Sequence, residues 1–189
     1  MKEEAKIEQY IDLIKSWNKT HNLVSSSQIN KLDEHVQDSL SIFKHTSQTL
    51  LDLGSGGGFP GIPIAIKGPE KKIFLIESNT KKASFLLNTT NKLNLKNISV
   101  INGRIEDLDP KEFPKDFEII ARAIGTTKNI IKITKKYLDL PGTKLKLMKT
   151  EEQFLKEQVP EDYTVKKIHK IPSKGKDKGR ILVTIEKDG

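Results

Sequence analysis

The chain has 189 residues, enough for one domain with a hydrophobic core and a short helical appendage. It has no cysteine, four scattered histidines, no apolar run of membrane-spanning length and no signal-peptide core, so we expect a cytoplasmic protein without disulfides or a metal. Its 33 Lys and Arg against 25 Asp and Glu give a net charge of +8, which favours a nucleic-acid partner but also fits an ordinary lysine-rich surface.

Residues 1–48 are predicted to form an N-terminal helical extension. Apolar residues recur at spacings of three and four between residues 3 and 19, with Lys and Glu between them, which indicates an amphipathic helix. A polar turn follows. Ser27 is the expected N-cap of a second helix that runs to about Lys44.

From residue 49 onward, short apolar runs alternate with amphipathic segments. This alternation predicts a parallel, doubly wound α/β sheet over residues 49–189. The last two strand-like runs flank a polar, basic loop and predict a C-terminal antiparallel hairpin that closes the sheet. The expected strands are 49–53, 72–77, 98–101, 117–121, 144–148, 163–171 and 180–185, and the expected helices are 62–67, 80–94 and about 127–138.

The strongest motif is a glycine-rich loop directly after the first of these strands, Asp52-x-Gly54-x-Gly56-x-Gly58. In a parallel sheet, ligands bind beyond the carboxyl ends of the strands. Glycines at that place let the backbone turn sharply and approach a ligand closely. Glu77 ends the next strand, where a carboxylate can accept both hydroxyls of a ribose. The pattern predicts a site for a cofactor that contains a nucleoside.

Two cofactors compete for this motif. Residues 56–61 match the G-x-G-x-x-G pattern of dinucleotide sites. The match starts late, however, and Pro60 lacks one of the N–H groups that would hold a pyrophosphate. Asp52 and Glu77 would repel a pyrophosphate but suit a sulfonium and an amino group. S-adenosylmethionine is therefore favoured over NAD.

The loop after the third strand is a second candidate for cofactor contact. It reads Gly103-Arg104-Ile105-Glu106-Asp107, and Ile105 could pack on the face of an adenine with Glu106 nearby. A surface turn with a salt bridge is the alternative interpretation.

With these motifs in place, the chain resembles the RsmG (GidB) methyltransferases over nearly its whole length, from about Tyr10 to Ile185. The extension of the glycine loop by Phe59-Pro60-Gly61-Ile62-Pro63 is far more specific than the glycines alone. The sequence departs from the family pattern at Gly57, Glu77 and Thr150, which bears on affinity more than on reaction type. The other matching blocks are His21-Asn22-Leu23, His35-x-x-Asp38-Ser39, Gly103-Arg104-Ile105-Glu106, Ala121-Arg122-Ala123, Met148-Lys149 and Gly179-Arg180.

The resemblance implies a Rossmann-like class I methyltransferase that uses S-adenosyl-L-methionine to methylate N7 of a guanine in 16S ribosomal RNA. It implies 16S ribosomal RNA or the small ribosomal subunit as partner. No membrane partner is expected, and a monomer is the default. Together with the motif analysis, it gives an expected cofactor set of Asp52, Gly54, Gly56, Gly58, Phe59, Glu77, Arg104, Ile105, Glu106 and Arg122. The substrate side is expected to hold Asn22, His35, Asp38, Arg104, Arg122, Lys149 and Arg180.

Several of these residues also have plainer interpretations. His35 and Asp38 lie three apart on a helix and could simply bond each other. Lys174, Lys176 and Lys178 could contact phosphate groups or form a solvated loop. A methyltransferase for a small molecule or a protein, and a nucleotide-binding module without catalysis, are the alternative functions.

Overall fold

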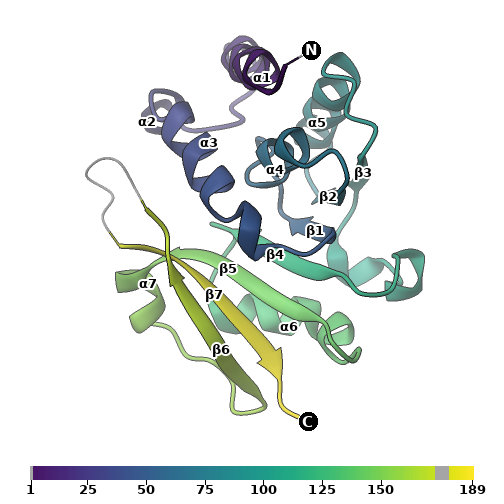
Figure 1. The fold of residues 1–189 in the computed structure, drawn as a ribbon, viewed down its shortest axis with the longest axis vertical. Helices are drawn as coiled ribbons and strands as arrows, with labels where there is room; N and C mark the ends of the chain where they lie inside the picture. The colour runs from purple at the N-terminus through teal and green to yellow at the C-terminus, as the bar shows by residue number, and fades with distance from the viewer. Residues whose placement is uncertain (1, 173–178) are drawn as a thin grey trace.

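A computed structural model describes residues 2–172 and 179–189 of the chain. Within these residues, seven strands form one sheet in the order β3-β2-β1-β4-β5-β7-β6 (Figure 1). The strands are β1 (Thr49–Leu53), β2 (Lys72–Glu77), β3 (Ile98–Asn102), β4 (Glu118–Arg122), β5 (Lys144–Thr150), β6 (Tyr163–Lys170) and β7 (Arg180–Lys187).

The pairing of the strands confirms the predicted sheet. β1 pairs in parallel with β2 and β4, β2 with β3, and β4 with β5. β7 is antiparallel to both β5 and β6, so the predicted C-terminal hairpin completes the sheet. The chain therefore leaves β1 toward β2 on one side and returns to β4 on the other, which is where a doubly wound sheet opens a crevice at the carboxyl ends of its strands.

Helices and short 3-10 turns connect the strands and cover the sheet. α1 lies at the top of the molecule in the view of Figure 1, and α6 packs on the other face of the sheet. The helical segments are α1 (Glu3–Asn18), α2 (Ser26–Ile29), α3 (Leu32–Ser41), η1 (Phe43–His45), α4 (Gly61–Lys67), α5 (Thr80–Lys92), η2 (Ile105–Asp107), η3 (Pro110–Glu112), α6 (Thr127–Leu138) and α7 (Glu151–Leu155).

Each face of the sheet has its own hydrophobic cluster. One cluster joins the sheet to α1, α3, α4 and α5 and includes the fully buried Tyr10 and Ile62. The other joins it to α6 and includes Ile131, Tyr137 and Val183. Burying one such side chain stabilises a fold by about 1.5–3 kcal/mol, so both layers are needed to hold the central strands in place.

The N-terminal segment differs from its prediction in one respect. The single helix expected from Ser27 to about Lys44 is wrong: α2, α3 and η1 are separate, and α2 is capped by Ser25 through a reciprocal capping box with Gln28. Lys31, with a non-helical backbone, separates α2 from α3. The break lets α3 turn Leu32, His35 and Val36 into the core, whereas α2 contributes only the partly buried Ile29.

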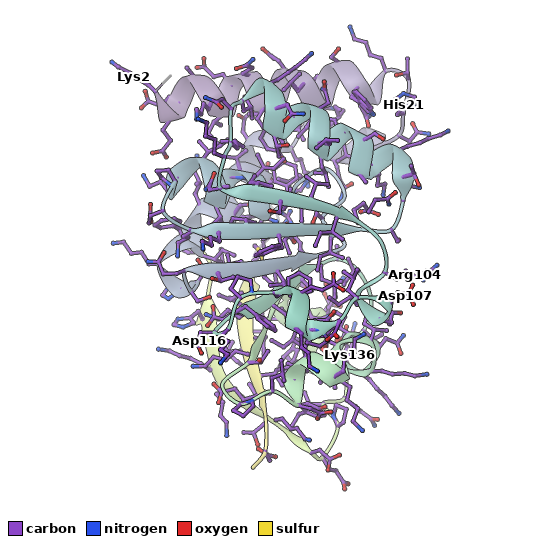
Figure 2. All side chains as sticks on the ribbon, turned by 90° about the vertical axis from the view of Figure 1, so that its right-hand side faces the viewer. Lys2, His21, Arg104, Asp107, Asp116 and Lys136 are labelled. Atoms are coloured by element: carbon purple, nitrogen blue, oxygen red, sulfur yellow. The ribbon has the colours of Figure 1, made fainter. Side chains whose placement is uncertain are left out.

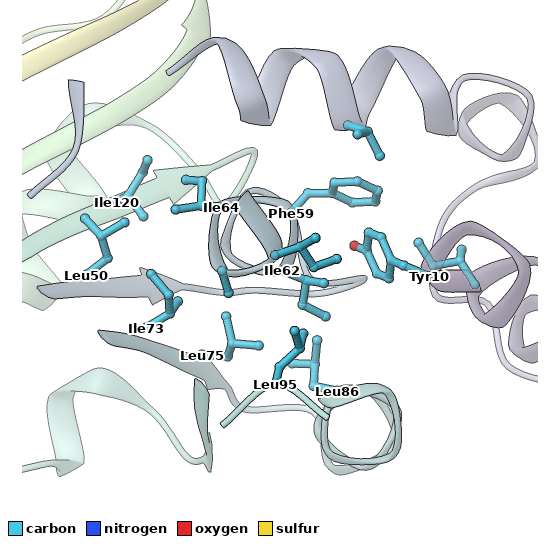
Figure 3. Close-up of a cluster of buried hydrophobic side chains, with 14 of the residues drawn as sticks. Tyr10, Leu50, Phe59, Ile62, Ile64, Ile73, Leu75, Leu86, Leu95 and Ile120 are labelled. Atoms are coloured by element: carbon cyan, nitrogen blue, oxygen red, sulfur yellow. The ribbon is translucent and has the colours of Figure 1, made fainter. Parts of the chain in front are cut away.

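The N-terminal helix packs directly on the glycine loop. The Tyr10 ring lies 5.3 Å from the Phe59 ring and beside Ile62 (Figure 3). The Tyr10 hydroxyl donates a 2.7 Å hydrogen bond to the Gly57 carbonyl. Residues 1–48 thus share a core with residues 49–189, and the division between them at residue 48 stays a prediction.

Candidate active site

A cavity of about 490 Å³ lies at the carboxyl ends of β1, β2 and β4. Its volume falls in the ordinary range for small-molecule and cofactor sites. The glycine loop forms one wall, and residues 122–124, at the end of β4 and just beyond it, form another. The N-terminal segment covers it with Leu23, Val24, Gln28 and His35. The predicted crevice therefore has a roof from the helical extension as well as walls from the sheet.

The glycine loop takes a backbone shape that side chains would disturb. Gly54, Gly56 and Gly58 have φ angles of 66°, 54° and 98°, in the left-handed region that favours glycine. A Cβ on Gly54 would lie 2.4 Å from the Ile124 side chain on the opposite wall. Gly54 and Phe59 line the cavity, whereas Gly58 is buried behind it.

Asp52 lies beneath the cavity rather than on its wall. Its side chain is completely buried, and Oδ2 accepts a 2.9 Å hydrogen bond from the Gly61 N–H at the start of α4. The other oxygen, Oδ1, has no hydrogen-bond partner among the described residues. Burial, the largest effect, raises the pKa of Asp52 from 3.8 to about 7. Any influence of Asp52 on a cofactor is therefore electrostatic or exerted through the loop.

Glu77 lines the cavity and links three loops. Its Oε2 accepts from the Gly56 N–H at 2.9 Å, and its Oε1 accepts from the Asn79 N–H at 2.8 Å. Its backbone carbonyl accepts from Gly103, in the loop after β3. A carboxylate has further lone pairs beyond these two bonds, so Glu77 can still accept hydroxyl groups from a ligand.

The loop after β3 has one buried and two exposed residues of interest. Ile105 is 1% exposed and lines the cavity, and its carbonyl is held by the Tyr137 hydroxyl at 3.0 Å. Arg104 and Glu106 line the cavity mouth and face solvent. Figure 2 shows Arg104 at this edge of the molecule. Lys136 Nζ donates to the Glu106 carbonyl in the same loop.

Four of the predicted substrate-side residues form one cluster beside the cavity. Arg122 is the last residue of β4, and its Nη2 lies 2.5 Å from His35 Nδ1 and 3.8 Å from Asp38 Oδ2. Arg180, from β7, lies 2.9 Å from the same Asp38 oxygen. Burial, the largest effect, lowers the pKa of Arg122, and the nearby Arg180 lowers it further. Of the four, Arg122 and His35 reach the cavity wall.

Two other predicted residues lie apart from this cluster. Asn22 is exposed in the turn after α1 and is not on the cavity wall. Lys149 also lies off the wall: its Nζ donates to the Gly125 carbonyl at 2.8 Å and pairs with Glu157 at 2.9 Å. No motif pointed to Glu157, because its only sequence signal is a charge in a polar segment.

Lys174, Lys176 and Lys178 lie outside the described residues.

A second cavity, of about 440 Å³, lies at the opposite, amino ends of β4 and β5. A bulge in β6 between Val165 and Lys167 lets the adjacent Lys166 and Lys167 line it together, although neighbours in a regular strand face opposite ways. Five lysines line this cavity against two glutamates: Lys44, Lys144, Lys146, Lys166 and Lys167 against Glu118 and Glu186.

A family model described as rRNA small subunit methyltransferase G, also called GidB, matches residues 3–181. The chain belongs to this family. The membership confirms the resemblance indicated by the motifs. It supports an S-adenosylmethionine-dependent ribosomal RNA methyltransferase over the small-molecule, protein and non-catalytic alternatives.

Relatives named ribosomal RNA small subunit methyltransferase G match this GidB chain over most of its length. The relative from Hydrogenovibrio crunogenus is 32% identical over 187 residues, which cover 97% of this chain and 85% of the relative. The relative from Nitrosomonas europaea is 34% identical over 186 residues, covering 96% and 86%. The match therefore includes both the helical extension and the sheet.

Solved structures at low identity share the fold. A variant of MtNAS in complex with S-adenosylmethionine has a TM-score of 0.64 at 10% identity, covering 98% of this chain and 76% of that one. A protein in the NADB-Rossmann superfamily from Streptococcus agalactiae has a TM-score of 0.59 at 14% identity, covering 80% and 68%. An S-adenosylmethionine-dependent methyltransferase from Aquifex aeolicus has a TM-score of 0.55 at 18% identity, covering 86% and 98%. The Rossmann-like class of this GidB chain is thereby confirmed.

Among the residues that the structure describes, no helix combines the length and apolar character needed to cross a membrane. In the same residues, no three His, Asp or Glu side chains gather in a way that could hold a metal ion.

Gly54→Ala tests the close approach of the glycine loop to the opposite wall. The new Cβ would push Ile124 into the cavity and strain a backbone that has φ of 66°. We expect S-adenosylmethionine affinity to fall by at least about tenfold, measured by calorimetry. Gly142→Ala is the matched control, because Gly142 has φ of 80° with nothing within 4 Å of its Cβ position and lies outside the cavity. Equal affinities in the two variants would contradict the assignment of this loop to the cofactor.

Asp52 should make stability depend on pH in a defined direction. Its folded-state pKa of about 7 exceeds the ordinary 3.8. The contribution of Asp52 to the free energy of unfolding is therefore complete below about pH 4 and is lost as pH rises through 7. Asp52→Asn keeps an acceptor for the Gly61 N–H but cannot titrate. We expect the unfolding free energy of the natural chain, relative to this variant, to fall by about 2–3 kcal/mol from pH 5 to pH 8 in denaturant titrations. Parallel pH profiles would show that Asp52 is not the titrating group.

Proposed function

We propose that this protein transfers a methyl group from S-adenosylmethionine to N7 of a guanine in 16S ribosomal RNA. The observation that carries the proposal is the cavity at the switch point of the sheet, with Glu77 on one side and the buried Arg122 cluster on the other. This arrangement occurs in a chain that matches the ribosomal RNA methyltransferase family over residues 3–181.

The cavity fits S-adenosylmethionine better than a dinucleotide. A pyrophosphate needs free N–H groups at the start of a helix. At the start of α4, Pro60 has no N–H, and the Gly61 N–H is already bonded to Asp52. Glu77 on the wall suits the ribose hydroxyls and a positive ligand, and the glycine loop leaves room for close backbone approach. Gly54, Phe59, Glu77 and Ile105 are the residues that would hold the cofactor.

The chemistry asks the protein mainly to position two reactants. S-adenosylmethionine supplies an electrophilic methyl group, and guanine N7 attacks with a lone pair that carries no proton. A general base is therefore not needed, and alignment and exclusion of water are the main contributions. His35 and Asp38 hold the Arg122 guanidinium against the cavity wall, where it can align the guanine through O6 while N7 stays free. The guanine must leave its stack to reach this depth.

The charge distribution supports an RNA partner. Binding of RNA is driven largely by contacts between basic side chains and phosphates. The chain has a net charge of +8, and five of its lysines line the cavity at the amino ends of β4 and β5. A ribosomal RNA substrate also supports action in the cytoplasm.

The direct test is transfer of radioactive methyl groups from S-adenosylmethionine to deproteinised 16S ribosomal RNA, to small ribosomal subunits and to small acceptors. We expect label in at least one of the two RNA substrates and none in the small acceptors. Borohydride reduction followed by aniline cleaves RNA at N7-methylguanosine, and a single cleavage position would locate the modified base. Label at an exocyclic amine or a ribose hydroxyl would refute the N7 assignment.

Arg122→Lys tests the role of the cluster. Lysine keeps the positive charge but cannot bond His35 and Asp38 at once with a planar fork. We expect a folded variant that still binds the cofactor and loses at least about tenfold in kcat, or about 1.4 kcal/mol of transition-state stabilisation. The measurement is single-turnover transfer at saturating cofactor and RNA. A natural transfer rate in Arg122→Lys would remove Arg122 from the substrate site.

A further inference from the structure

The loop between β4 and α6 forms a wall of the cofactor cavity in a strained conformation. Ala123 and Ile124 line the cavity directly after Arg122. Ala123 has φ of 56°, which is unfavourable for a residue with a side chain, and Gly125 has φ of 142°. Such backbone persists only where neighbouring groups hold it.

Lys149 and Glu157 hold the C-terminal end of this loop, where it enters α6. Lys149 Nζ donates to the Gly125 carbonyl at 2.8 Å. Glu157 Oε2 accepts from the Thr127 N–H at 2.7 Å and from the Thr127 hydroxyl at 2.5 Å. Glu157 Oε1 accepts from Lys149 Nζ at 2.9 Å, which links the contacts at Gly125 and Thr127.

This ion pair is better placed than an ordinary surface pair. The Lys149 and Glu157 side chains are only 9% and 15% exposed, so solvent screens them less. The negative charge of Glu157 also meets the first N–H of α6, where the helix dipole favours an anion. Burial alone would raise the pKa of Glu157, yet its bonds to Thr127 and Lys149 bring that pKa below its ordinary value.

We propose that Lys149 and Glu157 are a positioning pair that fixes the 123–126 wall, and through it Arg122, in the geometry that methyl transfer needs. The inference deepens the proposed function and rests on it for the identity of the reaction. It assigns Glu157 a role that no motif indicated. It also gives Lys149 the role of supporting the wall, in place of the contact with substrate expected from the sequence.

The test compares Glu157→Gln with a matched ion-pair control at the other end of α6. Glutamine keeps the size and an acceptor for Thr127 but removes the charge that holds Lys149. Asp139→Asn breaks the 2.7 Å pair of Asp139 with Lys187, which lies away from the cavity. Lys149→Met supplies a second route if Glu157→Gln does not fold, and the double variant Lys149→Met with Glu157→Gln completes the cycle.

We expect Glu157→Gln to raise the S-adenosylmethionine Kd by about threefold or more and to lower kcat for RNA by about fivefold or more, because the wall and Arg122 lose alignment. Amide hydrogen exchange over residues 125–127 should become faster. The double variant should be no worse than the more impaired single variant, since the pair acts as a unit. Asp139→Asn should leave Kd, kcat and this exchange unchanged.

Faster exchange in folded Glu157→Gln with natural Kd and kcat would overturn the proposal, because the pair would then support structure alone. Additive losses in the double variant would also overturn it. Failure of the natural chain to methylate RNA would instead refute the proposed function. The Kd and hydrogen-exchange measurements would still test the positioning pair in that event, because neither requires a methyl acceptor.

Discussion

The hydrogen bond from the Gly61 N–H to the buried Asp52 carboxylate is the contact on which the cofactor cavity depends. It joins the end of β1 to the start of α4 at 2.9 Å and so closes the segment 52–61, which carries the glycine loop. Gly61 has to be glycine at this distance, because a Cβ would come within 2.6 Å of Asp52 Oδ2 and 2.4 Å of Leu75. With the ends of the loop fixed, Glu77 can hold its middle through Gly56, and Tyr10 can hold it from above through Gly57. A carboxyl group at 0% exposure is costly to ionise, and the raised pKa of Asp52 reflects that cost.

The cavity combines charges of opposite sign on facing walls. Glu77 lies at the end of β2, and Arg122 lies two strands away at the end of β4. A cationic cofactor favours the first wall, and the electron-rich edge of a guanine favours the second. Arg122 is held by α3 through His35 and Asp38, so the N-terminal segment sets the direction of the substrate wall as well as roofing the cavity. His35 and Asp38, which the sequence also allowed to bond only each other, both contact Arg122.

The sequence predicted the sheet well because buried parallel strands are apolar on both faces and end at glycine or polar turns. It also placed Gly54, Phe59, Glu77 and Ile105 on one cavity, since the carboxyl ends of neighbouring strands must meet. It could not give the direction of side chains at those ends. Asp52 was expected beside the ligand, but the alternation along β1 turns it toward α4 and under the loop. The sequence also did not predict the break in the helix before Leu32. Nor did it predict α7, because a helix of five residues is too short to give a periodic signal. The chain returns through α7 and so brings Glu157 back to Lys149.

The position of β7 has a consequence for synthesis of the chain on the ribosome. β7 lies between β5 and β6 in the sheet, yet it is translated after both. Until residues 180–187 emerge, β5 presents an unpaired edge and β6 has no partner strand, and open edges of this kind recruit strands from other chains. The cofactor cavity is built from earlier residues, but Arg180 at the start of β7 is needed to complete the Arg122–Asp38 cluster beside it. The nascent protein can thus form the cofactor cavity before the Arg122–Asp38 cluster is complete, and in that interval the unpaired edges of β5 and β6 expose it to aggregation.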